Sequence, residues 1–168
     1  MYLSPLSIQF IWHPEDKETV FPIVEYCKQK LSRNPDNSFL HSLDFPIFCY
    51  TSKNDDLPPE INTMAEKTLV FAFVGSSIIA SDEWTEYLSE VEKKDGVKVI
   101  YIALDRTALN YISPSNAIRY GDYIKKYQDI ELSRRMFVEI SHEIYRWLFC
   151  FKDHKQLKLF ISHAKSDD

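Results

Sequence analysis

The stretch Thr-Leu-Val-Phe-Ala-Phe-Val at residues 68–74 decides the fold class, because it is apolar at almost every position. A strand with one face in water alternates polar and apolar residues, whereas an unbroken apolar strand is buried on both faces. Burial on both faces is typical of a central strand in a parallel sheet that helices cover on each side. The sequence therefore predicts an α/β protein, and the segments around residues 68–74 must supply its other strands and its covering helices.

The flanking segments alternate between the patterns of strands and helices. Short apolar runs rich in β-forming residues predict further strands at 7–12, 45–50 and 97–104. Helices are expected at 17–31, 60–67, 83–93 and 131–149, the longest of them with apolar residues three and four positions apart. Residues 76–82 are interpreted as a turn and residues 105–128 as irregular. Alternating strands and helices favour a parallel sheet, whose ligands bind outside the carboxyl ends of the strands.

Composition narrows the function classes. The chain has 168 residues, the size of one domain, and a net charge of −5, which argues against nucleic-acid binding driven by overall charge. Its only glycines are Gly75, Gly96 and Gly121. Neither a GxGxxG sequence nor a GxxxxGK[ST] sequence can be written with them, so glycine-rich phosphate-binding loops are excluded.

Cysteine, histidine and hydropathy patterns indicate the cellular setting. Three cysteines without a CxxC pair predict free thiols of a reducing compartment, and five histidines without ligand spacing predict no metal site. The N-terminus lacks the basic and apolar regions of a signal peptide, and no run of 18 apolar residues is present. We therefore expect a soluble cytoplasmic domain with neither a nucleic acid nor a membrane as partner.

A short internal repeat lies near the end of the chain. Phe10-Ile11-Trp12-His13 and Phe160-Ile161-Ser162-His163 both end an apolar run and lead into an acidic segment, 150 residues apart (163 minus 13). One interpretation is that residues 1–150 form one domain and residues 151–168 form a linker and the first strand of a second, truncated domain. The alternative is that residues 157–162 add a sixth strand to the same domain.

Three stretches resemble the TIR (Toll/interleukin-1 receptor) domain family. LFISHAKSDD at 159–168 is similar to its opening strand and first loop, and FIWHPED at 10–16 to the same strand end. TLVFAFVGSSIIASDEW at 68–84 resembles its third strand, its serine-containing turn and the tryptophan that enters the next helix. The resemblance implies a flavodoxin-like three-layer sandwich with a mostly parallel five-stranded sheet. It also implies one of two roles, assembly through TIR–TIR contacts or cleavage of NAD⁺, often in bacterial antiphage defence.

The resemblance also locates a candidate catalytic position. Catalytic members of the family carry a glutamate four residues after this tryptophan, whereas the residue four positions after Trp84 is Leu88. Cleavage of an N-glycosidic bond needs a carboxylate near the ribose. Glu86 is the first candidate for a displaced catalytic carboxylate, and the alternative is that it belongs to a solvated helix face. Trp84 itself joins the candidate ligand-binding residues.

Other candidate ligand-binding residues follow the first and third strands. Trp12 and His13 end the first strand and are candidates for stacking on an adenine or nicotinamide ring, or else are rim residues packed against the first helix. Ser76 and Ser77 are candidates for hydrogen bonds to a ribose or phosphate, or else serve the turn or a helix cap. Asp105 does not indicate a response regulator, because the acceptor aspartate of that family follows the third strand.

Three functions remain open at this point. The first is a non-catalytic signalling or regulatory module that binds other TIR domains through the loop 50–59 and neighbouring helix edges, beside a catalytic TIR domain that begins near Leu157. The second is an NAD⁺ glycohydrolase that releases nicotinamide with Glu86. The third is a receptor that binds a nucleotide signal without cleaving it. No cofactor is required in any of them, and NAD is a substrate or ligand in the last two.

Overall fold

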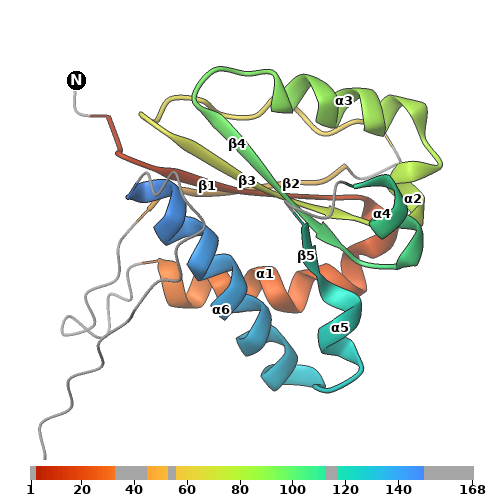
Figure 1. Cartoon of the computed structure of the whole chain (residues 1–168). Helices are drawn as coiled ribbons and strands as arrows, with labels where there is room; N and C mark the ends of the chain where they lie inside the picture. Colours follow the sequence, from red (N-terminus) through yellow and green to blue (C-terminus); the bar gives the residue numbers. More distant parts are fainter. Residues whose placement is uncertain (1–2, 33–44, 53–55, 113–116, 150–168) are drawn as a thin grey trace, which may run out of the picture.

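The computed structural model describes residues 3–32, 45–52, 56–112 and 117–149 (Figure 1). The expected linker and second-domain strand at 151–168, and the alternative sixth strand at 157–162, lie outside the described residues. In the part of the chain that is described, no helix is long and apolar enough to cross a membrane.

The sheet has five strands in the order β2-β1-β3-β4-β5, and all four neighbouring pairs are parallel. The strands are β1 (Ser7–Trp12), β2 (Ile47–Tyr50), β3 (Thr68–Val74), β4 (Val97–Ala103) and β5 (Ala117–Arg119). This order is that of the flavodoxin-like fold, which places a ligand crevice at the carboxyl ends of β1 and β3. The predicted α/β class with a parallel five-stranded sheet is confirmed.

Helices cover both faces of this sheet (Figure 1). They are the 3-10 turn η1 (Pro14–Asp16), α1 (Lys17–Leu31), α2 (Ser76–Ile79), α3 (Asp82–Glu92), α4 (Arg106–Tyr111), α5 (Tyr120–Ile124) and α6 (Asp129–Leu148). The layer of α1, α5 and α6 lies on one face, and the layer of α2, α3 and α4 lies on the other.

β3 is central, and all seven of its residues are buried. Phe71 and Phe73 pack with residues of α1 and α6, whereas Val70 and Ala72 pack with residues of α3. Phe10 of β1 lies opposite Phe71 in the register and stacks on it, with ring centroids 5.6 Å apart. The unbroken apolar sequence of β3 therefore has the expected cause, since each face meets a layer of helices.

The predicted helix at 60–67 is wrong, because the segment is irregular and its backbone bonds to distant residues. In a helix, the Asn62 carbonyl would accept from the Glu66 amide. Instead the Asn62 carbonyl accepts from the Gln9 side-chain amide, and the Glu66 amide donates to the Ser4 carbonyl over 2.9 Å. The Asn62 amide in turn donates to the Tyr50 hydroxyl over 2.8 Å. These tertiary hydrogen bonds replace the helical ones.

The prediction that residues 105–128 are irregular is also wrong, since α4, β5 and α5 lie there. These elements have three to six residues each, too few for a periodic pattern to be recognised. β5 exists because it pairs with β4, with Ile118 opposite Ile102. Similarly, the expected turn at 76–82 contains the short helix α2. The other predicted strands and helices are confirmed, with ends that differ by at most two residues.

Candidate functional site

The carboxyl ends of β1, β3 and β4 meet at one edge of the sheet because the three strands are parallel and adjacent. His13 directly follows β1, Gly75 and Ser76 directly follow β3, and Asp105 lies two positions beyond the end of β4. Trp84 and Asp16 also reach this edge, as their contacts show. We call these six residues, His13, Asp16, Gly75, Ser76, Trp84 and Asp105, the carboxyl-edge cluster.

His13 is packed between the sheet edge and α3. Its ring lies 5.1 Å from the ring of Trp84, centroid to centroid, at an angle of 60°. Only 6% of His13 and 1% of Trp84 are exposed. His13 Nδ1 accepts a hydrogen bond of 3.3 Å from the Glu15 amide, which caps η1.

Asp105 fastens two short helices to the end of β4. Its Oδ1 accepts from the Ala108 amide over 2.9 Å, which caps α4. Its Oδ2 accepts from the Ser76 amide over 2.8 Å, at the start of α2. Both carboxylate oxygens are therefore occupied by backbone donors, so Asp105 acts as a structural brace across the edge.

Asp16 is the acidic group of the cluster with unused hydrogen-bonding capacity. Its Oδ2 is buried and has no hydrogen-bond partner among the described residues. Burial raises the pKa of the Asp16 carboxyl, His13 opposes that rise, and the neighbouring carboxylates of Asp105 and Glu15 add to it. A carboxyl group with a raised pKa at the ligand-binding edge of this fold is a candidate proton donor or acceptor.

Gly75 lets this carboxyl group approach the end of β3. A Cβ atom built on Gly75 would lie 3.1 Å from Asp16 Oδ1 and 3.2 Å from Oδ2, closer than ordinary van der Waals contact. The close approach therefore accounts for a glycine at this position.

The serine and tryptophan candidates are placed differently from one another. Ser76 is exposed and Ser77 half-buried, both in the first turn of α2 at the cluster. Trp12 is buried and packs with the residues of α1 and α6, whereas Trp84 is buried on the opposite face of the sheet. Neither indole N–H has a hydrogen-bond acceptor within the described ranges. The structure thus brings His13, Ser76, Ser77 and Trp84 to one edge and separates Trp12 from Trp84 by the sheet.

Glu86 lies on the solvent side of α3. It is exposed, and at about 100° per residue it is about 200° around the helix from Trp84. Its carboxylate therefore points away from the helix face that contacts His13. Leu88, which stands at the position of the family's glutamate, is 3% exposed and packs in the core with Trp84.

Asp16 and Asp105 are the cluster residues that the sequence analysis missed as site residues. The sequence patterns mark Asp16 only as part of the stretch FIWHPED, and Asp105 only as a residue that does not fit a phospho-acceptor. The one available signal was their position, since each closely follows a predicted strand of a parallel sheet.

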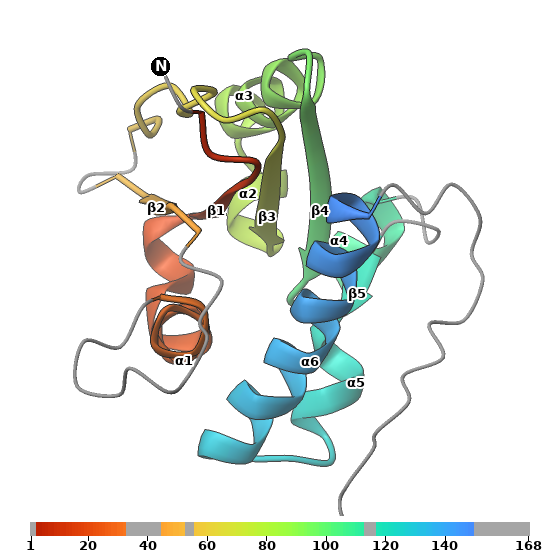
Figure 2. The same cartoon turned by 90° about the vertical axis from the view of Figure 1, so that its left-hand side faces the viewer.

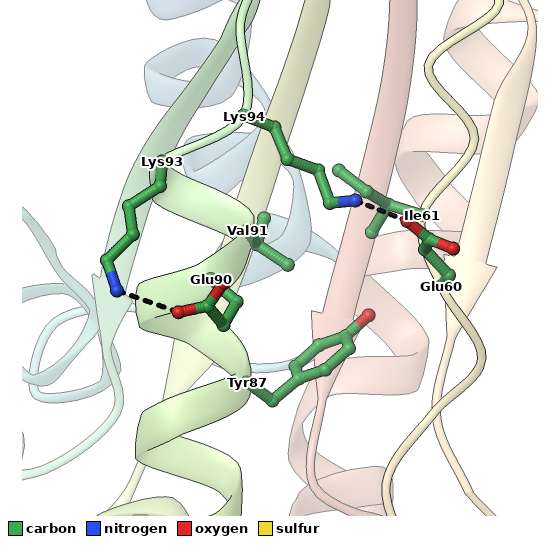
Figure 3. Close-up of a pocket in the computed structure, with 7 residues that line it drawn as sticks. All are labelled: Glu60, Ile61, Tyr87, Glu90, Val91, Lys93 and Lys94. Atoms are coloured by element: carbon green, nitrogen blue, oxygen red, sulfur yellow. Dashed lines mark hydrogen bonds and ion pairs between the residues drawn. The ribbon is translucent and has the colours of Figure 1, made fainter.

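Apart from the carboxyl-edge cluster, a hollow with a volume of about 460 Å³ lies between α3 and the segment around Glu60 (Figure 3). The Tyr87 ring crosses it, and its hydroxyl donates to the Pro59 carbonyl over 3.0 Å. Burial raises the pKa of Tyr87 to about 12, and the neighbouring Tyr50 and Glu60 add to the rise. The charged side chains that line the hollow form ion pairs, Lys94 with Glu60 and Lys93 with Glu90. This hollow was unforeseen because residues 60–67 were expected to form a helix.

Within the described residues there is no group of three or more histidine, cysteine, aspartate or glutamate side chains that could hold a metal ion. Comparisons with protein-family models, with curated proteins and with solved structures find no match.

Proposed function

We propose that this chain is a TIR-like signalling or regulatory module of the bacterial-defence type, which acts by binding other TIR domains and does not itself cleave NAD⁺. The observation that carries the proposal is the burial of Leu88. The family's catalytic glutamate would stand there, and a core leucine that packs with Trp84 supplies no carboxylate.

The hydrogen bonds at the carboxyl edge support the same proposal. Asp105 uses both carboxylate oxygens on backbone amides, and His13 uses Nδ1 on the Glu15 amide. Trp84 is buried, so its ring faces offer a ligand no stacking surface. These groups stabilise the loops at the edge of the sheet, so their role is structural.

Incubation with NAD⁺ tests the absence of catalysis. We expect the full chain, shown to be folded by circular dichroism, to release no nicotinamide above a protein-free blank on chromatography. Release by the wild-type chain that disappears in Glu86→Gln would contradict the proposal. Glu83→Gln, an exposed glutamate three residues earlier on the same helix, is the matched control.

The binding half of the proposal needs a separate test. An NAD⁺-cleaving TIR domain is mixed with increasing amounts of this chain, and both co-sedimentation and nicotinamide release are measured. We expect the two proteins to sediment together and the rate of release to change. If neither quantity changes at about 100 µM chain, binding to such a domain is refuted.

A second candidate function, cleavage or binding of NAD⁺ at the carboxyl edge, is favoured by Asp16. Its partly buried carboxyl group, with a raised pKa and an unpaired oxygen, lies where this fold binds ligands. In this alternative Asp16 takes the role first considered for Glu86. Nicotinamide release that Asp16→Asn abolishes and Glu86→Gln preserves would establish it.

Thermal unfolding in the presence of nucleotides tests whether the chain binds a nucleotide without cleaving it. A ligand of the native state at 100 times its Kd adds about 2.7 kcal/mol of stability, so a nucleotide receptor must show a raised Tm with NAD⁺, ADP-ribose or another nucleotide. We expect no shift with any of them if the chain is an association module alone.

A further inference from the structure

The hollow between α3 and the segment around Glu60 has walls that are held in place apart from its charged groups. Tyr87 of α3 donates to the Pro59 carbonyl over 3.0 Å, which fixes the segment to the helix. The Asn62 carbonyl accepts from the Gln9 side-chain amide, which fixes the same segment to β1. Figure 2 shows the segment, drawn in yellow, beside α3 on the face of the sheet opposite α1 and α6. The hollow is therefore preformed, and a ligand does not have to order it.

This hollow has the size of a small-molecule site. Its volume of about 460 Å³ lies within the ~300–1,000 Å³ that ligand pockets have. It lies along the C-terminal half of α3 and the two lysines that follow this helix, whereas Trp84 of the carboxyl-edge cluster lies near the N-terminus of α3. The residues that line it include no member of that cluster. A ligand in the hollow is therefore bound separately from the carboxyl edge.

The hollow has an apolar floor and a charged rim. Ile61 and Val91 are buried side chains that line it, and the Tyr87 ring lies between the helix and the segment. Lys94 pairs with Glu60 across the hollow, so an ammonium group and a carboxylate meet at its rim. Figure 3 shows this pair toward one end of the hollow and Tyr87 toward the other. A ligand that matches both ends carries charge at one end and an apolar group at the other.

The Lys94–Glu60 pair decides which charges the ligand carries. The Lys94 ammonium lowers the pKa of the Glu60 carboxyl, so both groups are charged at neutral pH. An ion pair with an exposed partner contributes little to stability, so a ligand that enters between the two groups loses little. A ligand with a single charge pairs with one group and leaves the other without a partner. A zwitterion pairs its carboxylate with Lys94 and its ammonium group with Glu60, and no charge is left over.

The second ion pair of the hollow does not alter this balance. Lys93 and Glu90 pair over 2.7 Å at the end of α3, and both side chains are exposed. Figure 3 shows them on the side of the helix turned away from the segment around Glu60. This pair adds no net charge, so the Lys94–Glu60 pair remains the charged feature that faces a ligand.

We propose that this hollow binds a free α-amino acid with an apolar side chain. The ligand carboxylate bonds to Lys94, its ammonium group bonds to Glu60, and its side chain packs against Tyr87 and the apolar floor. An α-amino acid carries both charges on one carbon atom, which suits two protein groups that are in direct contact with each other. The inference goes beyond the proposed function and does not rest on it, because the carboxyl-edge cluster takes no part in the site.

NMR titration of the ¹⁵N-labelled full chain with L-phenylalanine and with L-leucine tests the proposal. We expect saturable shifts of the Ile61, Tyr87 and Val91 amides, with a Kd between about 0.1 and 1 mM for a ligand of this size. Three analogues of L-phenylalanine each remove one feature. 2-Phenylethylamine lacks the carboxylate, 3-phenylpropanoate lacks the ammonium group, and glycine lacks the apolar side chain. Each should bind the wild-type chain at least about tenfold more weakly than L-phenylalanine.

Two variants should change the preferred charge of the ligand. Lys94→Gln leaves Glu60 without its ammonium partner, so this variant should bind 2-phenylethylamine more tightly than L-phenylalanine. Glu60→Gln leaves Lys94 without its carboxylate partner, so this variant should bind 3-phenylpropanoate more tightly. Lys28→Gln is the matched control, because Lys28 pairs with Glu25 on α1 and its side chain is 38% exposed, against 30% for Lys94. It should leave the Kd of every ligand unchanged.

The wild-type chain alone decides the main question. If neither L-phenylalanine nor L-leucine shifts the three amides at about 20 mM, the inference is overturned. Shifts confined to the carboxyl-edge cluster overturn it too, as do equal Kd values for L-phenylalanine and its singly charged analogues. Because these measurements need no substitution, they hold even where circular dichroism shows that a variant fails to fold.

The variants then test the assignment of the two charges. Unchanged preferences in Lys94→Gln and Glu60→Gln, or an equal loss of binding in Lys28→Gln, overturn it. Nicotinamide release and binding to another TIR domain are measured separately. A failure of amino-acid binding therefore leaves the proposed function standing, and a failure of the proposed function leaves this site standing.

Discussion

Removal of the Asp105 carboxylate should destabilise two helices at once. Asp105 follows β4, and its two oxygens accept from the amides of Ala108 in α4 and Ser76 in α2. Ser76 and Asp105 are 29 positions apart in the chain, so a single side chain joins two segments that only the sheet brings together. Asp105→Ala deletes both hydrogen bonds and leaves the backbone otherwise unchanged.

The structure sets the expected size of this effect. Loss of an N-cap such as the one at Ala108 costs about 0.5–2 kcal/mol. The Ser76 amide is exposed, so water replaces part of the second bond and its loss adds about 0.5–1 kcal/mol. We therefore expect Asp105→Ala to lower the free energy of unfolding by about 1–3 kcal/mol. Asp105→Asn keeps one oxygen acceptor but turns an amide donor toward the other N–H, and should lose about half as much.

Urea denaturation at pH 7, followed by circular dichroism, measures both changes. The m-value should stay constant, because the same surface is exposed on unfolding. Asp95→Ala is the matched control, since Asp95 is exposed and its carboxylate makes no hydrogen bond to any described residue. We expect its effect to stay within about 0.5 kcal/mol. If Asp105→Ala costs no more than Asp95→Ala, the bracing role is refuted.

Three further predictions test separate parts of the structure. Because the pKa of Asp16 is raised in the folded chain, the folded state holds this proton more tightly than the unfolded state, and stability falls as the pH rises through and above 3.8. Asp16→Asn should remove this fall. In urea titrations, the stability of the variant relative to wild type should therefore be greater at pH 7 than at pH 3. Leu88→Ala should lower the free energy of unfolding by about 2–4 kcal/mol because it leaves a cavity, whereas Glu86→Gln on the solvent side should change it by less than about 0.5 kcal/mol. Equal effects of the two variants would contradict the placement of α3. Burial raises the pKa of the Cys27 thiol, so mass spectrometry should find it alkylated at pH 8 only as fast as the chain unfolds, and rapid labelling in the native state would show that it is accessible.

Local patterns predicted the main elements well. The strands at Ser7–Trp12 and Thr68–Val74 and the helix at Lys17–Leu31 agree with the sequence prediction to the residue. Their signals, an unbroken apolar run or an apolar face every three to four residues, are contained within the element itself. Tertiary contacts only need to bury the face that the sequence already marks.

Elements that depend on distant partners were missed. Residues 60–67 looked helical by themselves, but Gln9 and Ser4 bind their backbone and hold it irregular. The three-residue strand β5 has no pattern of its own and exists through its pairing with β4. On α6 the sequence showed the stripe that faces the core, while the exposure of Val138 and Tyr145 became visible only once the neighbours of the helix were placed.

In the candidate site, too, the sequence predicts some features and tertiary contacts set the others. The rule that ligands bind at the carboxyl ends of parallel strands predicts that His13 and Ser76 lie at one edge of the sheet, and the resemblance to TIR domains adds Trp84. The sequence does not predict that both carboxylate oxygens of Asp105 accept hydrogen bonds from backbone amides, or that the Asp16 carboxyl group lies against Gly75. Those outcomes depend on side-chain distances across the edge, which the strand order sets.

Hydrophobic patterns in the sequence predict the fold class, most elements and the sheet edge at which ligand-binding residues are expected. Hydrophobic periodicity encodes these features because burial acts on each element separately. Only the three-dimensional packing shows that Trp84 and Leu88 lie in the core with His13 against the indole, and that Glu86 faces solvent. Each of these depends on which residues, distant along the chain, compete for the same space and the same hydrogen-bond donors.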